Sequence, residues 1–432
     1  MSKRTALRVL LNGREVGFVH MARSGAIGFG YSPEWLALDG AFPISLSLPL
    51  SERPHQGAPV ISYLENLLPD NPAIRERVAI KVSARGLDAL SMLEEIGRDC
   101  VGALQFVPEN KHYETFTSIE GKDVSDTDIA QILRDLKPSP LGMEAEDYFR
   151  ISIAGAQEKT GLLKHNSKWL RPVGMTPTTH ILKTQLGTLP NGIDLQDSVE
   201  NEFFCMKFCE FMGLKIADVA IQKFDDIKAL VIERFDRRWL GPDKLIRIPQ
   251  EDFCQALAVP PSQKYQSDGG PNIIDCMALL KASNTPTEDQ TAFMKAQTLF
   301  WLLGATDGHA KNFSIALKPG GFTMTPLYDI LSAQKALDDG QIRHTQMKLA
   351  MSLGDNNHYR LDNVAVRHFL QTAKSAGFGV TLVTDILQDV DDNIEQAIEK
   401  TIKVLPADFP EELTDSLMAG IQKRKKSLAL GL

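Results

Sequence analysis

The sequence has no apolar run long enough to span a bilayer. Its longest purely apolar stretches, such as Leu299 to Leu303, fall far short of the roughly 18 to 20 residues that a transmembrane helix needs. The first residues lead into an alternating pattern without an apolar core of about 7 to 15 residues, so no signal peptide is expected. These absences predict a protein that stays in the cytosol and contacts no membrane.

Basic residues are outnumbered by acidic ones, and cysteines are few. With 47 Lys and Arg against 55 Asp and Glu, the formal net charge is −8. The chain as a whole therefore cannot be the main counter-charge for a phosphate backbone, and any contact with DNA is expected to be local or to depend on a partner. The 5 cysteines are an odd number in a chain without an export signal, so we expect reduced, buried thiols.

The length of 432 residues corresponds to two or three domains at about 150 residues each. Residues 1–108 are expected to form a small α+β subdomain, and the charged segment 109–148 a connector. Strand patterns dominate 149–236, the expected nucleotide-binding part, and 237–432 is expected to form a helical lobe. This order predicts a two-lobed α+β enzyme.

Local patterns predict the elements that border the polar segments. Asn12-Gly13 between two alternating runs predicts a β-hairpin, and apolar spacing predicts a helix over 199–212. A strand is expected at 149–153. Towards the carboxyl end we expect helices, most clearly over 291–304, with a hairpin near 313–331 as the only break.

The loop 304–312 contains the densest polar cluster and directly follows an apolar helix. Asp307 and Asn312 stand at the spacing with which protein kinases place a carboxylate beside the attacking hydroxyl and an amide oxygen on a metal ion. Asp329, across a Gly-Gly hairpin, is placed to fold back as a second metal ligand. Alternatively, Asp307 caps a helix, Asn312 forms a turn and Asp329 is solvated, but the order and spacing of the three residues favour a catalytic loop.

Phosphoryl transfer also requires a cation and a backbone-rich loop at the phosphates. Lys183 ends an expected strand, where a buried lysine is costly unless an anion pairs with it; a lysine that reaches the surface is the alternative. Glu202 or Glu200 is a candidate to orient Lys183, or belongs to a solvated helix face. The segment 152–161 is rich in small residues but matches no Walker A motif, so an ordinary hairpin fits its spacing better. The segment 231–236 closes the strand-rich part, where a hinge would offer backbone groups to adenine.

Several segments carry distinctive sequence blocks. They are FRISIAGAQEKT at 149–160, ERFDR at 233–237, PQEDFCQAL at 249–257 and TDGHAKN at 306–312. These blocks resemble the signature blocks of the HipA family, the Ser/Thr-protein kinase toxins of bacterial HipBA toxin–antitoxin modules. The segments 46–50 and 65–70 also resemble the smaller domain of that family, so the sequence is identified as a HipA family member over nearly its whole length.

The resemblance implies a bilobal kinase-like fold, related to protein and phosphatidylinositol kinases, that uses ATP and Mg²⁺. It implies Asp307 as the catalytic base, Asn312 and Asp329 as metal ligands and Lys183 as the phosphate contact. Ser152 would be the autophosphorylated serine in the loop over ATP. The residues expected to contact the nucleotide are Ser152, Ile153, Ala154, Gly155, Ala156, Gln157, Lys183, Glu233, Phe235, Asp236, Gln250, His309, Lys311, Asn312, Tyr328 and Asp329.

The resemblance also implies a function and partners. The expected activity inhibits growth by phosphorylating a translation component, with glutamyl-tRNA synthetase as the expected substrate, and autophosphorylation at Ser152 would inactivate the toxin. A HipB-like helix-turn-helix antitoxin is the expected partner, through which the complex would bind operator DNA and repress its operon.

Two other function classes stay open. A metal-dependent hydrolase would use Asp307, His309 and Asp329 around an activated water and would need neither Lys183 nor a nucleotide. A non-catalytic co-repressor would bind an antitoxin and DNA. The basic run 423–426 could touch DNA when a partner holds it there, although a solvated helix end is the simpler interpretation.

Overall fold

The computed structural model describes residues 6–22, 24–110, 118–136, 141, 151–153, 157–189 and 192–432. The chain divides into two compact units, each built from separate stretches of sequence. The first unit comprises Met1–Thr184, Gln222–Ser262 and Ile315–Phe322, and the second comprises Gln185–Ile221, Gln263–Ser314 and Thr323–Leu432. Parts of the predicted connector at 109–148 lie outside the described residues, as do Phe149, Arg150, Ala154, Gly155 and Ala156. Within the described ranges, no helix has the length and apolar character needed to cross a membrane.

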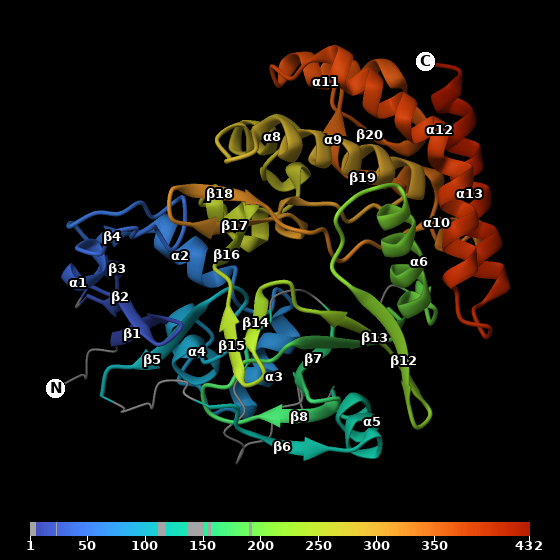
Figure 1. Ribbon diagram of the computed structural model, residues 1–432. Helices are drawn as coiled ribbons and strands as arrows, with labels where there is room; N and C mark the ends of the chain where they lie inside the picture. The colour runs from blue at the N-terminus through green and yellow to red at the C-terminus, as the bar shows by residue number, and fades with distance from the viewer. Residues whose placement is uncertain are drawn as a thin grey trace. The chain divides into compact units, whose positions relative to one another are not determined.

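The amino-terminal part of the first unit contains a 5-stranded antiparallel sheet with the strand order β4-β3-β2-β1-β5 (Figure 1). Its strands are β1 (Ala6–Leu11), β2 (Arg14–Met21), β3 (Ile27–Tyr31), β4 (His55–Gln56) and β5 (Leu104–Pro108). The predicted hairpin is confirmed, because Asn12 and Gly13 connect β1 to β2 with φ values of 48° and 82°. Two consecutive positive φ angles are what a type I′ turn requires.

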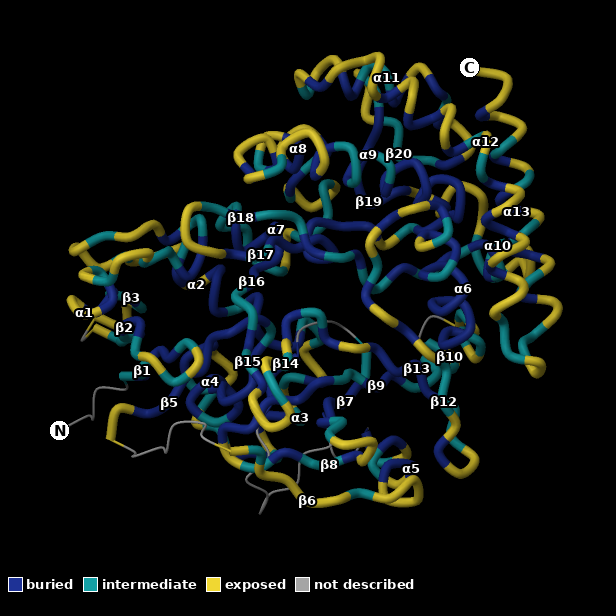
Figure 2. Tube along the Cα trace, viewed as in Figure 1, coloured by how far each residue is buried: buried dark blue, intermediate teal, exposed yellow. Residues whose placement is uncertain are grey.

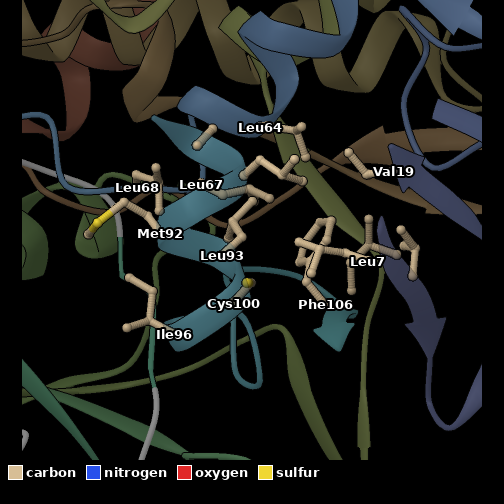
Figure 3. Packing of buried hydrophobic residues seen from close by; sticks show 14 of the residues in the cluster. Leu7, Val19, Leu64, Leu67, Leu68, Met92, Leu93, Ile96, Cys100 and Phe106 are labelled. Carbon is tan, nitrogen blue, oxygen red and sulfur yellow. The ribbon is translucent and has the colours of Figure 1, made fainter. Parts of the chain in front are cut away.

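Helices cover this sheet and bury an apolar core against it. They are α1 (Pro33–Leu36), α2 (Ala58–Glu65), α3 (Pro72–Lys81) and α4 (Ala89–Ile96). Figure 3 shows the core, in which Leu7 and Val19 from the strands lie with Leu64 from α2 and Leu93 from α4. Because β-strand side chains alternate between the two faces of a sheet, the apolar residues of β1 and β2 are directed to one side.

A 6-stranded sheet with the order β12-β13-β9-β7-β8-β6 follows. Its strands are β6 (Gly121–Val124), β7 (Lys159–His165), β8 (Lys168–Pro172), β9 (His180–Thr184), β12 (Val219–Phe224) and β13 (Ile227–Glu233). Helix α5 (Asp126–Arg134) packs on this sheet through Ile129 and Leu133, which share a core with Leu162 and Leu182. The chain passes between the two units within β12.

The described part of the strand expected at 149–153 is not a strand. Ile151 to Ile153 have no regular secondary structure. The Ser152 N–H donates to the Asp99 carbonyl at 3.0 Å, and the Ser152 hydroxyl donates to the Leu67 carbonyl at 2.6 Å. The segment is buried by its isoleucines, which produced a strand-like apolar pattern, but its polar groups pair outside any sheet.

The first unit extends beyond the predicted boundary at residue 236. Its remaining elements are β14 (Arg237–Gly241), β15 (Lys244–Arg247), β16 (Gln250–Asp252) and α7 (Phe253–Ala256). The predicted hairpin around the Gly320-Gly321 turn is confirmed as β17 (Ser314–Lys318) and β18 (Gly321–Met324), which form a 3-stranded sheet with β16. The boundary at 236 falls inside a unit because Arg237 and Arg247 bind Asp99 of the same unit.

The second unit consists mainly of helices. They are α6 (Ser198–Phe211), α8 (Ile273–Lys281), α9 (Pro286–Leu303), α10 (Gln334–Asp338), α11 (Val366–Ser375), α12 (Val380–Val404) and α13 (Glu411–Ala429). Helices α8, α12 and α13 pack against α9, so its carboxyl-terminal half is buried (Figure 2). The helix ends as predicted at Gly304, whose φ of 70° is the left-handed conformation typical of a residue that terminates a helix.

The expectation of a single break in the helical pattern is wrong. The expectation concerned the chain after residue 249, where the second unit contains the strand pair β19 (Lys348–Leu353) and β20 (His358–Arg360). The short strands β10 (Gly187–Thr188) and β11 (Asp194–Leu195) of the same unit precede this region. Leu349, Met351 and Leu353 alternate with smaller residues, and Gly354 with a φ of 75° begins the turn. This period of two is a strand signal that the surrounding helical pattern obscured.

Candidate active site

In the second unit, the loop after α9 carries the predicted catalytic residues. The Ala305 N–H donates to the Phe300 carbonyl at 2.9 Å, which completes the end of the helix. A Cβ atom at Gly308 would lie 2.4 Å from the Phe300 ring, so only glycine fits there. The loop ends in a 3₁₀ turn at Ala310–Asn312. These contacts fix the backbone on both sides of Asp307.

Asp307 combines a restrained backbone with an exposed side chain. Its carbonyl oxygen accepts hydrogen bonds from the Asn312 side-chain amide at 2.8 Å and from the His309 N–H at 2.9 Å. Its side chain is 53% exposed, and a carboxylate oxygen lies 3.7 Å from His309 Nε2. A carboxylate held in this way can accept a proton from a group that approaches from solvent.

Tyr265 is a site residue that the sequence did not reveal. Its hydroxyl donates a hydrogen bond to the Asp307 carboxylate, and its ring packs edge-on against His309 with centroids 4.8 Å apart. The preceding residue, Lys264, accepts a hydrogen bond from the Ala310 N–H and places its ammonium group over the Tyr265 ring. Residues 264–265 therefore pack against the catalytic loop at Asp307, His309 and Ala310.

His309, which packs against Tyr265, is buried, with 3% of its surface exposed. Burial lowers its pKa below the ordinary value of 6.5, and the positive charge of Lys264 acts in the same direction, while Asp307 and Asp329 oppose the shift. The imidazole is therefore neutral at pH 7.

Asp329 has a strained backbone and a firmly anchored neighbour. Its φ of 61° is uncommon for a residue with a side chain and is a feature that concentrates at functional sites. The hydroxyl of Tyr328 donates to the Lys311 carbonyl at 3.0 Å and lies 2.6 Å from the Ser314 hydroxyl. The structure thus joins the segment of Asp329 to the catalytic loop.

The donor set of this loop suits magnesium. Mg²⁺ prefers oxygen ligands and usually takes one or two carboxylates, with water and substrate phosphates completing its shell. Asp329 offers a carboxylate, and Asn312, whose amide nitrogen is bonded to Asp307, has its amide oxygen left for a cation. Within the described ranges, no cluster of three or more His, Cys, Asp and Glu side chains forms a metal cage. The residues therefore fit a Mg²⁺ ion whose remaining ligands are supplied by phosphate oxygens and water.

In the first unit, Lys183 lies in β9 and is only 4% exposed, so the alternative of a surface lysine is wrong. In the antiparallel pair of β7 and β9, Lys159 stands directly opposite Lys183 and is also buried. Residues directly opposite each other point to the same face of a sheet. The first unit therefore brings two lysines together, of which the sequence analysis singled out only one.

Glu200 and Glu202 lie on α6 in the second unit. Both are buried, so the alternative of a solvated helix face is wrong for them. The Glu200 carboxylate accepts a hydrogen bond from the Gln185 side chain at 2.6 Å. Gln185 in turn accepts from the N–H of Val199 at the start of the helix.

Of the residues in the segment 152–161 that are expected to contact the nucleotide, the structure describes Ser152, Ile153 and Gln157. Ser152 is fully buried, and Gln157 donates from its side chain to the Thr184 carbonyl at 2.9 Å, directly after Lys183. Ala154, Gly155 and Ala156 lie outside the described residues. The two ends of the loop are thus attached to the unit that carries the lysines.

The predicted hinge residues differ in exposure. Glu233, at the end of β13, is exposed, Phe235 is half-buried and Asp236 is buried. The Asp236 carboxylate is bound by Arg234 at 2.8 Å and Arg237 at 3.0 Å, and it accepts from the Gly102 N–H and, at 3.4 Å, from Gln250. These contacts anchor the hinge to the amino-terminal part of the same unit.

A second carboxylate, Asp99, completes a buried ionic network. It accepts from Arg237 at 2.9 Å, Arg247 at 3.0 Å and Arg234 at 3.4 Å. Burial opposes the ionisation of Asp99, but the three arginines outweigh it and hold its pKa well below the usual range. The pKa of Asp236 is lowered in the same way, since Arg234 and Arg237 outweigh its burial. Both carboxylates are charged, and they hold the hinge in place.

The predicted site residues fall into two groups. The first unit carries those expected at the phosphates and the adenine, and the second carries the catalytic loop and the residues expected at the metal. The five cysteines are free and buried, as expected.

Family models cover most of the chain. The family model for the HipA-like C-terminal domain matches residues 151–398, and the model for the HipA N-terminal domain matches residues 7–107. The carboxyl-terminal model includes the candidate residues of both units from Ser152 to Asp329.

Known proteins are similar to the chain over nearly its full length. A Sinorhizobium fredii protein named as a kinase, Y4mE, is 33% identical over 400 residues, which is 92% of each chain. The Shewanella oneidensis protein named "Serine/threonine-protein kinase toxin HipA" is 27% identical over 391 residues, covering 87% of this chain and 84% of that protein. A chain in the solved complex of Shewanella oneidensis HipA, HipB and operator DNA superposes with a TM-score of 0.82 at 23% identity, covering 98% of this chain and 97% of that one. This similarity confirms the predicted α+β kinase-like fold.

Proposed function

The chain belongs to the HipA family, and from this premise we propose that it is the Ser/Thr protein kinase toxin of a HipBA module. The observation that carries the proposal is the geometry of the loop after α9. There Asp307 is exposed while its backbone carbonyl is bound by Asn312, and Tyr328, the residue before Asp329, donates to the Lys311 carbonyl of the same loop.

In this function, Asp307 is the general base. The hydroxyl oxygen of the substrate forms a bond to the γ-phosphorus of ATP, the bond from that phosphorus to the β,γ-bridging oxygen breaks, and ADP leaves. The hydroxyl proton passes to the Asp307 carboxylate, which Tyr265 orients by its hydrogen bond. Such transfers depend on positioning and charge stabilisation more than on covalent chemistry.

Asn312 and Asp329 would hold Mg²⁺, which when bound neutralises charge on the phosphates. Lys183 and Lys159 supply positive charge for the phosphates from the first unit, together with the loop from Ser152 to Gln157. The adenine side of the nucleotide is proposed to contact the hinge residues Glu233, Phe235 and Asp236, together with Gln250. His309, Lys311 and Tyr328 are proposed to contact the nucleotide from the catalytic loop.

Autophosphorylation at Ser152 is proposed as the inactivating step. The Ser152 hydroxyl is buried and donates to the Leu67 carbonyl, so it must leave this position to be phosphorylated. A phosphate of charge about −1.5 to −2 does not fit this buried position, because it would face the Leu67 carbonyl oxygen, which carries no proton to donate to it. The loop would then remain out of its present position.

The proposed partners are a HipB-like antitoxin and, through it, operator DNA. The net charge of −8 supports recruitment by a partner rather than direct binding. Within the basic run at 423–426, Arg424 is buried and Lys425 pairs with Glu395, so Lys423 and Lys426 are the exposed members of the run. Glutamyl-tRNA synthetase is the proposed substrate.

The test incubates the purified protein with γ-labelled ATP, Mg²⁺ and a cell lysate, and identifies the labelled proteins. Thermal unfolding with ATP is measured alongside, since a ligand of the folded state stabilises it by RT ln(1 + [L]/Kd). Labelled protein together with ATP stabilisation supports the kinase. Stabilisation by Mg²⁺ alone would favour the hydrolase, and the absence of both effects would favour a non-catalytic co-repressor.

A further inference from the structure

The last helix, α13, places a buried cation between the two segments that carry the predicted catalytic side chains. Arg424 is 9% exposed. Its Nε donates to the carbonyl of Leu302 at 2.7 Å, and its Nη1 donates to the side-chain oxygen of Gln334 at 2.9 Å. Leu302 lies in the last turn of α9, which leads to Asp307, and Gln334 begins α10, which follows Asp329.

The same two segments also touch each other. The Ala333 N–H donates to the Gly304 carbonyl at 2.9 Å, and the Ser332 hydroxyl donates to the Leu303 carbonyl. Asn201 of α6 exchanges two hydrogen bonds of 2.9 Å with the backbone of Ser332. Arg424 therefore completes a junction at which the start of the catalytic loop and the end of the Asp329 segment are joined.

The space around the guanidinium is shaped by two glycines. A Cβ atom at Gly420 would lie 2.7 Å from Arg424 Nη2 and 2.6 Å from the Gln334 oxygen, and a Cβ atom at Gly304 would lie 3.3 Å from the same nitrogen. Glycine inside a helix is unfavourable, and Gly420 lies within α13. Its presence there is explained by the room that the Arg424 and Gln334 side chains need.

The charge of Arg424 complements the end of α9. The last carbonyls of a helix have no intrahelical partner and carry partial negative charge, and Leu302 offers one of them. Burial lowers the pKa of Arg424 to about 10, against the effect of Asp338 on α10. The side chain therefore stays protonated at neutral pH.

We propose that Arg424 is a positioning residue, which fixes the loop 304–312 relative to the segment 329–334 and hence Asp307 relative to Asp329. The proposal rests on the kinase function given above. Arg424 acts through the backbone of α9 and the side chain of Gln334. A misplacement of about 1 Å is sufficient to lower a rate about 100-fold, so a residue that sets this distance controls turnover.

The test compares Arg424→Lys with two variants on the same helix. Lysine keeps the charge. It lacks the planar guanidinium, whose fixed N–H directions allow Arg424 to donate to Leu302 and Gln334 at the same time. Ser416→Ala removes the 2.6 Å hydrogen bond from α13 to Asp338 of α10 without touching α9, and Lys425→Ala removes a neighbouring surface charge. Arg424→Met serves as a second, uncharged variant.

Two readouts are measured at a temperature at which all variants are folded. The first is the steady-state rate, for which Arg424→Lys is expected to lower kcat about 10- to 100-fold with a much smaller change in the KM for ATP. The second is backbone hydrogen exchange, which is expected to accelerate at 304–312 and 329–334 in the Arg424 variants. Ser416→Ala and Lys425→Ala are expected to change neither.

Wild-type kcat and wild-type exchange in Arg424→Lys and Arg424→Met would overturn the proposal. Equal losses in Ser416→Ala would also overturn it, because they would assign the effect to general loosening of α13. If the wild-type protein transfers no phosphoryl group, the kinase function fails instead, and the exchange measurement alone decides whether Arg424 positions the loop.

Discussion

The side-chain amide of Asn312 donates a 2.8 Å hydrogen bond to the backbone carbonyl of Asp307. The predicted base and a predicted metal ligand are therefore linked directly within one loop. The contact uses the backbone of Asp307, so its carboxylate remains directed to solvent, and it uses the amide nitrogen of Asn312, so the amide oxygen remains for a cation.

Asp307→Asn is expected to abolish most phosphoryl transfer. The amide keeps the size of the side chain but cannot accept the hydroxyl proton, and loss of a general base costs about 10² to 10⁴ in rate. Labelled-phosphate transfer measures the loss, and Asp355→Asn, the same change at an exposed turn, is the control. Full activity of Asp307→Asn would exclude this loop as the catalytic one.

Tyr265→Phe is expected to lower kcat about tenfold and leave the fold intact. The ring can still pack on His309, but the hydrogen bond to the Asp307 carboxylate is lost, and a bond to a charged group contributes about 1.5 to 3 kcal/mol. Steady-state kinetics and the thermal midpoint are measured on the same preparation. An unchanged kcat would mean that Tyr265 does not orient the base.

The sequence allowed Asp307, Asn312 and Asp329 to be singled out because kinase chemistry requires these residue types in a fixed order along the chain. Tyr265 lies 42 residues before Asp307, and no local pattern links the two. Arg424 appeared only as part of a basic run. Its burial follows from how α13 packs on α9, which is a tertiary contact.

The apolar periods predicted the hairpin at Asn12 and the helix that ends at Gly304, because both have local signals. They misassigned the segment at Ile151 to Ile153, whose polar groups bind Asp99 and Leu67. The arginines around Asp236 were likewise missed, since their partner Asp99 is distant in sequence. Local periodicity reports which residues are buried but not what their polar groups bind.

Asp99→Asn is expected to destabilise the first unit by about 3 to 5 kcal/mol, because removing one member of a buried ionic network leaves charge uncompensated. Urea unfolding measures the change. Asp123→Asn, in the exposed ion pair with Lys168, is the control and is expected to cost less than about 1 kcal/mol. Similar losses in both variants would mean that the network contributes no more than a surface pair.

The same network predicts acid sensitivity. The folded pKa values of Asp99 and Asp236 lie below the ordinary value of 3.8, so at a pH below 3.8 the unfolded chain binds more protons than the folded one. Their contribution to stability is therefore complete above that range and is lost as the pH falls through the folded values. In Asp99→Asn the acid-induced fall in the thermal midpoint should be smaller, and an unchanged fall would assign it to other groups.

Glu251→Gln is expected to stabilise the protein at alkaline pH. Glu251, next to Gln250 in β16, is fully buried, and burial raises its pKa to about 8. One carboxyl oxygen accepts from the Leu46 N–H at 2.8 Å, which opposes the rise in the pKa, while the negative charge of Asp252 adds to it. The carboxyl group is therefore protonated at pH 7. Glutamine resembles this neutral form, because each offers a carbonyl oxygen as acceptor and an uncharged donor group, the O–H of the acid or the NH2 of the amide.

The sign of the effect follows from the two pKa values. Between pH 4.5 and about 8 the unfolded chain has lost the Glu251 proton while the folded chain retains it, so wild-type stability falls as the pH rises, on the order of 1.4 kcal/mol per pH unit. Glu251→Gln cannot ionise and removes this slope. Urea unfolding at pH 5 and pH 8 should therefore show little difference between the proteins at pH 5 and a more stable variant at pH 8. The exposed Glu52→Gln should follow the wild type at both values, and parallel pH profiles for Glu251→Gln and wild type would show that Glu251 is ionised in the folded protein.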